Sequence, residues 1–99
     1  MKYRISRKAD ADIERICDYI AEDNPDAADR LDEQIHRAIR LVAKFPGLGH
    51  SRPDVQDKRC FIRAVGRYVI AYRLEKKELV VIRVVYGARD FRRLFPPNE

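Results

Sequence analysis

The sequence predicts an α+β fold in which an antiparallel helical hairpin packs on a small twisted antiparallel sheet, in the order β-α-α-β-β-β. In the first half of the chain the apolar residues recur with a helical period, and from Arg59 onward the period changes to two. The links between the predicted strands are short, which favours an antiparallel meander. Ninety-nine residues suit one hydrophobic core, so we expect residues 1–99 to form a single domain.

A short strand over residues 3–5 and a helix from about Lys8 to Glu22 are expected at the amino end. Ser6 offers the hydroxyl of an N-cap just before this helix. One apolar stripe runs along the helix through Ile13, Ile16, Cys17 and Ile20. The opposite, polar side is expected to carry Asp10, Asp12, Glu14 and Asp18.

The second helix starts at Asn24-Pro25, because asparagine is a good N-cap and proline suits the first helical position. Asp26 adds a negative charge near the positive end of the helix dipole. The apolar stripe of this helix consists of Ala28, Leu31, Ile35, Ala38, Ile39, Val42 and Phe45. Two amphipathic helices joined by a tight break predict a hairpin, and the proline and glycine residues in 45–53 predict a loop after it.

Three strands follow, with turns at Gly66-Arg67 and at residues 75–78. Their alternation predicts a face toward the hairpin made of Ile62, Tyr68, Ile70, Tyr72, Val80, Ile82, Val84 and Tyr86. The opposite face is then expected to carry Arg63, Arg73 and Arg83, one on each strand, among Phe61, Val69, Val81 and Val85. Such a face suits contact with a partner. Arginine stems that only cover the sheet, with their charged ends in water, are an equally good reading.

The net charge of +5 lies wholly in the second half of the chain. Residues 1–50 hold nine Lys/Arg and ten Asp/Glu, whereas residues 51–99 hold twelve and six. A basic half suits a phosphate backbone or an acidic protein as partner, and a solvated basic surface is the alternative. Two distant cysteines, no export signal and no apolar stretch of membrane-spanning length predict a reduced, cytoplasmic protein without membrane association.

No cofactor or metal is expected, because the histidines and cysteines lack ligand spacing and no phosphate-binding or nucleophile motif is present. Metal-independent RNA cleavage needs cations and a group that moves protons near neutral pH. His50 is the one titrating candidate in the basic part of the chain. The tyrosines of the strands fall on the predicted core face, which argues against their catalysing such a step.

The order of these segments resembles the RelE/ParE superfamily of bacterial toxins from toxin–antitoxin pairs over essentially the whole chain. The segments that carry the resemblance are Ser6-Arg7-Lys8-Ala9, Asn24-Pro25-Asp26-Ala27-Ala28, Phe45-Pro46-Gly47-Leu48-Gly49 with Arg52, Arg67-Tyr68-Val69-Ile70-Ala71-Tyr72-Arg73 and Val84-Val85-Tyr86-Gly87-Ala88-Arg89-Asp90. The resemblance implies a helical hairpin on an antiparallel sheet, with a short helical turn at the carboxyl end as an additional expectation. It also implies a cognate antitoxin as partner, in a toxin–antitoxin hetero-oligomer, at a surface that the sequence leaves unknown.

The carboxyl-terminal segment favours the ParE-like branch, whose members inhibit DNA gyrase, over the RelE-like branch, whose members cleave messenger RNA in the ribosome. Phe91 and Phe95 stand where a RelE-like nuclease is expected to have a tyrosine or histidine, and a phenyl ring transfers no proton. The expected target-binding residues are Arg63, Arg73, Arg83, Arg89, Arg92 and Arg93. In the RelE-like alternative Arg63, Arg83 and His50 form the catalytic set, and a basic nucleic-acid-binding module is a second alternative.

Overall fold

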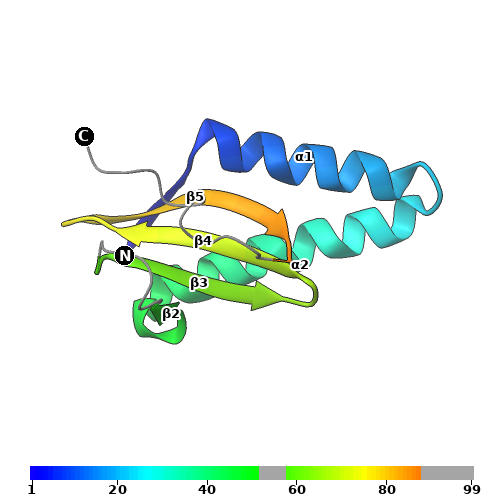
Figure 1. Ribbon diagram of the computed structural model, residues 1–99. Coiled ribbons are helices and arrows are strands. Elements are labelled where there is room, and N and C mark those ends of the chain that lie inside the picture. The colour runs from blue at the N-terminus through cyan, green and yellow to red at the C-terminus, as the bar shows by residue number, and fades with distance from the viewer. Residues whose placement is uncertain (52–57, 88–99) are drawn as a thin grey trace.

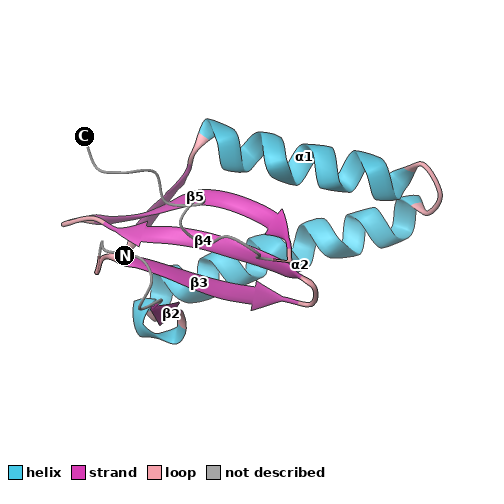
Figure 2. Cartoon of the chain, in the orientation of Figure 1, coloured by secondary structure: helices cyan, strands magenta, loops and turns pink. Residues whose placement is uncertain are grey.

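Two helices pack on one face of a five-stranded sheet, which confirms the predicted α+β fold (Figure 1). The computed structural model describes residues 1–51 and 58–87. The elements are β1 (Lys2–Ile5), α1 (Arg7–Ala21), α2 (Pro25–Lys44), the 3₁₀ turn η1 (Pro46–Leu48), β2 (His50–Ser51), β3 (Cys60–Val65), β4 (Tyr68–Leu74) and β5 (Glu78–Tyr86). The strands lie in the order β1-β5-β4-β3-β2 (Figure 2). The expected carboxyl-terminal helical turn lies outside the described residues.

The sheet is mixed rather than wholly antiparallel, because β1 lies parallel to β5 at one edge. Their register runs from Lys2 opposite Glu78 to Ile5 opposite Val81. At the other edge, β2 adds two residues beside β3 within the predicted loop. Strand periodicity shows which residues share a face but not which strand lies alongside, so neither pairing followed from the sequence.

Both helices begin at the predicted caps. The Ser6 hydroxyl accepts a hydrogen bond from the Ala9 N–H at 3.1 Å, and the Asn24 side-chain oxygen accepts one from the Ala27 N–H at 3.0 Å. Pro25 occupies the first turn of α2, where its missing N–H costs no helical bond. These contacts fix the residue at which each helix begins.

The main core lies between the helices and the sheet. Its buried members are Ala9, Ile13, Ile35, Ile39, Val42, Ile70, Tyr72, Leu79, Val81 and Val84. Tyr72 is the largest of them, and its hydroxyl donates to the Pro46 carbonyl at 3.0 Å. Gly49 is needed beside it, because a β-carbon at that position would overlap the Tyr72 hydroxyl. The end of α2 is therefore tied to the centre of β4.

The predicted facing of β3 is wrong by one residue. Phe61 lies opposite Tyr72 in the register and stacks on its ring, with 5.7 Å between the ring centroids, so Phe61 packs against the main core. Ile62 lies opposite Ala71 and packs with Cys60 on the face away from the helices. Both phases of β3 are largely apolar, and the alternation alone therefore did not decide between them.

The predicted facing of β5 is wrong where the strand bulges. Tyr72 lies opposite Val81 and Ala71 lies opposite Arg83, so Ile82 is an extra residue in β5. The inward positions are consequently odd-numbered before the bulge and even-numbered after it. Val81 packs in the main core, whereas Ile82 belongs to the small cluster on the open face.

Candidate functional site

The three strand arginines do not share one open face. Arg73 lies opposite Cys60 and Val80, on the face away from the helices, as expected. Arg63 lies opposite the buried Ile70 and so projects to the helix side, where its Nη1 is 3.4 Å from the Leu48 carbonyl oxygen. The predicted row of arginines on the open face is thus wrong for Arg63, and its contact with a target stays a prediction.

Arg83 is committed to an ion pair with the buried Asp12 of α1. Its Nε lies 2.7 Å from Oδ2 of Asp12 and its Nη2 lies 3.1 Å from Oδ1. The same carboxylate accepts the Val84 N–H at 3.0 Å and Nη2 of Arg15 at 2.7 Å. Asp12 was expected on the polar side of its helix, and its 2% exposure shows that expectation to be wrong.

The position of Asp12 follows from the end of β1. The parallel register stops at Ile5 and Val81, and beyond it α1 takes the place of the strand along β5. The Ser6 hydroxyl donates to the Ile82 carbonyl at 3.0 Å, and Asp12 then accepts the N–H of Val84. Two side chains thereby satisfy backbone groups that a neighbouring strand would otherwise pair.

The electrostatics keep this contact ionised. Burial alone would raise the pKa of Asp12, but the hydrogen bonds from Arg83, the Val84 N–H and Arg15 hold the pKa below its ordinary value. In return the Asp12 carboxylate raises the pKa of Arg83. Arg83 therefore stabilises the packing of α1 on β5. The sequence did not predict this role, because 71 residues separate Arg83 from Asp12.

The other predicted residues are scattered or lie beyond the described chain. His50 is exposed in β2, opposite Ile62. Arg89, Arg92 and Arg93 fall outside the described residues.

Within 1–51 and 58–87, no group of His, Cys, Asp and Glu side chains is arranged to hold a metal ion. No helix in these ranges has the length and apolar character needed to span a membrane. Neither Cys17 nor Cys60 forms a disulfide.

A tyrosine–arginine contact at one end of the sheet was not predicted. Tyr86 was expected in the core but is 62% exposed. Its ring meets that of Tyr68 edge to face, with 5.2 Å between centroids, and its hydroxyl lies 3.4 Å from Nη1 of Arg67. Burial raises the pKa of both Tyr68 and Tyr72, so neither phenol is tuned to accept a proton at neutral pH.

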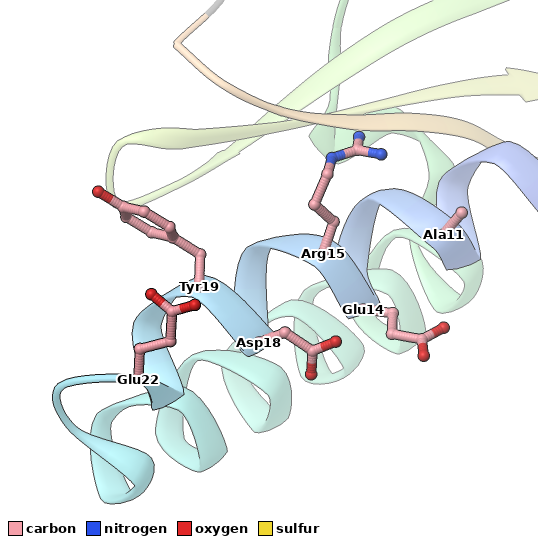
Figure 3. A pocket seen from close by; sticks show the side chains of 6 residues that line it. All are labelled: Ala11, Glu14, Arg15, Asp18, Tyr19 and Glu22. Carbon is pink, nitrogen blue, oxygen red and sulfur yellow. The ribbon is translucent and has the colours of Figure 1, made fainter.

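An open hollow on the outer side of α1 offers no enclosed site (Figure 3). Arg15 and Tyr19 extend from it toward the strands. Its lining consists of Ala11, Glu14, Arg15, Asp18, Tyr19 and Glu22. The acidic groups give this side of the molecule a charge opposite to that of the basic second half of the chain.

The described residues thus form a helical hairpin over a mixed sheet, and the strand arginines are divided between the ion pair with Asp12 and the two faces of the sheet. The fold is similar to that of a solved structure described as the chromosomal ParDE TA system from P. aeruginosa, with a TM-score of 0.75 and 20% sequence identity, covering 89% of this chain and 97% of that one. The family model of the ParE toxin of the type II toxin-antitoxin system, parDE, matches residues 3–91, and the chain belongs to that family. No curated protein sequence matches the chain.

Proposed function

We propose that this protein inhibits DNA gyrase and is neutralised by a cognate antitoxin. The observation that carries the proposal is the ParE family match across residues 3–91. The proposed mode is non-enzymatic: the basic half of the chain binds the topoisomerase and holds it in an unproductive state. Electrostatic attraction would speed this encounter and make it dependent on salt.

The geometry of Arg83 supports inhibition over RNA cleavage. A nuclease arginine must be available to stabilise charge on a phosphate in the transition state. Arg83 instead gives two hydrogen bonds to Asp12, and leaving that carboxylate would strand a buried charge. Arg63 is also turned away from the open face, so the two arginines of the RelE-like alternative lie on different sides of the sheet.

Arg73 is the described residue that the proposal places in contact with the target. It lies on the open face of β4, the middle strand of the sheet, near the end of that strand. The matched control is Arg40, a half-exposed cation on α2 that reaches Glu33 at 3.2 Å. Arg73→Ala should reduce inhibition of gyrase about tenfold or more, while Arg40→Ala should change it less than about twofold.

Two assays with the same purified protein test the proposal. Supercoiling of relaxed plasmid by gyrase should fall as protein is added, and recover when the antitoxin is supplied. Ribosome-bound messenger RNA should remain intact at the same concentrations. Cleaved messenger RNA with normal supercoiling would reverse the assignment in favour of the RelE-like alternative. If the protein neither inhibited supercoiling nor cleaved messenger RNA, toxicity through either target would be refuted.

A further inference from the structure

Two tyrosines and an arginine meet where the turn between β3 and β4 lies beside the end of β5. Tyr68 lies opposite Tyr86 in the sheet, and their rings meet edge to face with 5.2 Å between the centroids. Nη1 of Arg67 lies 3.4 Å from the hydroxyl oxygen of Tyr86. Tyr68 is half-buried, whereas Arg67 and Tyr86 are exposed. We call these three residues the sheet-end cluster.

The backbone beneath the sheet-end cluster is held by its own hydrogen bonds. The Gly87 N–H donates to the Arg67 carbonyl at 2.7 Å, which joins the turn to the residue that follows β5. Gly66 and Gly87 have positive φ angles of 59° and 58°, which glycine adopts without strain. The cluster is therefore positioned before any partner binds, and groups ordered in advance lose less entropy on binding.

Tyr86 differs from the other exposed aromatic residues of the chain. Phe45 was expected in the core stripe of α2, and its 52% exposure corrects that expectation. In the part of the chain that the structure describes, no ring contact joins Tyr3, Tyr19 or Phe45 to another aromatic side chain. The exposed ring of Tyr86 is instead packed against a second tyrosine and beside an arginine. Tyrosine and arginine are the residue types enriched where binding energy concentrates at protein interfaces.

Arg67 is a cation whose own surroundings supply no anion. Its polar neighbour among the described residues is the neutral phenol of Tyr86, and no carboxylate acts on it. Residues 58–74 contain five Lys/Arg and no Asp/Glu, and residues 79–87 contain no Asp/Glu. A guanidinium presents parallel N–H groups that match the two oxygens of a carboxylate. The sheet-end cluster therefore combines an apolar ring with a charge that a partner can neutralise.

We propose that the sheet-end cluster is a binding hot spot for the target protein, in which Arg67 pairs with a carboxylate and Tyr86 packs on the apolar surface beside it. The inference rests on the proposed function, so the carboxylate belongs to a gyrase subunit. It adds a second contact region to that of Arg73, which lies near the other end of β4. Six residues of strand separate the two arginines by about 20 Å, so their effects on binding should be additive.

A nucleic acid is the competing occupant, because a guanidinium also binds phosphate. Surfaces that bind nucleic acids line up several cations along the backbone and present ring faces on which bases stack. Here Arg63 reaches the Leu48 carbonyl and Arg83 is bonded to Asp12. The two rings of the sheet-end cluster meet edge to face, so they do not offer parallel faces to successive bases. A protein carboxylate is therefore the occupant proposed.

The test measures the affinity of the full-length protein for immobilised gyrase by surface plasmon resonance, together with inhibition of supercoiling. Arg67→Ala and Tyr86→Ser should each weaken binding at least about tenfold. Arg67→Glu should weaken it further than Arg67→Ala, because a like charge would then face the carboxylate. The matched controls are Arg4→Ala and Tyr3→Ser, which change exposed residues of β1 beside the opposite end of β5. Each control should alter affinity less than about twofold, and circular dichroism checks that every variant is folded.

Equal affinity of Arg67→Ala and the unaltered protein, or of Arg67→Glu and Arg67→Ala, would overturn the proposed ion pair. Binding of the protein to a DNA duplex without gyrase, if lost in Arg67→Ala, would assign the sheet-end cluster to nucleic acid instead. An unaltered protein that neither binds nor inhibits gyrase would refute the proposed function and this contact with it. Inhibition that is unchanged in the cluster variants would refute the contact alone.

Discussion

Replacing Asp12 by alanine should destabilise the protein more than replacing an exposed acidic residue of α1, because Asp12 is buried against β5. The carboxylate is 2% exposed and accepts four hydrogen bonds, from Arg83 twice, from Arg15 and from the Val84 N–H. Alanine removes all four and leaves a guanidinium and a backbone N–H without their acceptor. The change therefore breaks a buried ion pair from its acidic side.

Breaking a buried pair by removing one partner costs about 3–5 kcal/mol. The Arg83 side chain is 30% exposed and can recover part of its hydration, which favours the low end, about 3 kcal/mol. For a domain of this size, each 1 kcal/mol lowers the midpoint of thermal unfolding by about 4–8 °C. The expected decrease for Asp12→Ala is thus roughly 12–24 °C.

Urea unfolding followed by circular dichroism measures the change, with Asp18→Ala on the exposed side of the same helix as control. Asp18→Ala should stay within about 0.5 kcal/mol of the unaltered protein. Arg83→Met and the double variant complete a thermodynamic cycle, whose coupling energy should exceed about 1 kcal/mol. A cost below about 1 kcal/mol for Asp12→Ala, or strict additivity in the cycle, would refute the reasoning from the ion pair.

Three further predictions follow from the same contacts. Because the folded-state pKa of Asp12 is lowered, its stabilising contribution is present above the unfolded pKa, near 3.8, and is lost as the pH falls through the lower folded value; acid titration of Asp12→Asn should lack this loss, and an identical acid transition would contradict it. Gly49→Ala should destabilise by about 1–3 kcal/mol because its β-carbon meets the Tyr72 hydroxyl, while Gly47→Ala, whose β-carbon has open space, should be nearly neutral; equal thermal midpoints would count against that contact. Ser6→Ala should cost about 1–2 kcal/mol by chemical denaturation, since it removes an N-cap and the bond to the Ile82 carbonyl, and an unchanged midpoint would show both bonds to be dispensable.

Local signals in the sequence were enough to predict the helices and the fold class. Ser6 and Asn24 cap the two helices as expected, and Pro25 starts the second one. Each of these features depends on residues within one helical turn of one another, so it can be predicted from the local sequence. The strands from residue 60 onward were likewise visible from their period of two.

The candidate site was harder to predict because its geometry depends on distant pairing. The bulge at Ile82 changes which residues of β5 face the helices, and no glycine or proline in the strand announces it. Asp12 reads as an ordinary polar residue of an amphipathic helix until β5 is placed beside it. Tyr86 follows the alternation but is the last residue of β5, and it is exposed.

The pairing of β1 with β5 also has a consequence for how the chain folds during synthesis. The first strand finds its partner only in residues 78–81, and α1 is fastened to β5 through residues 82–84. Contacts of such long sequence separation form late, because closing the intervening loop costs entropy before any contact repays it. A nascent chain whose residues 78–86 are still inside the ribosome therefore lacks both the partner strand of β1 and the strand to which α1 is bonded.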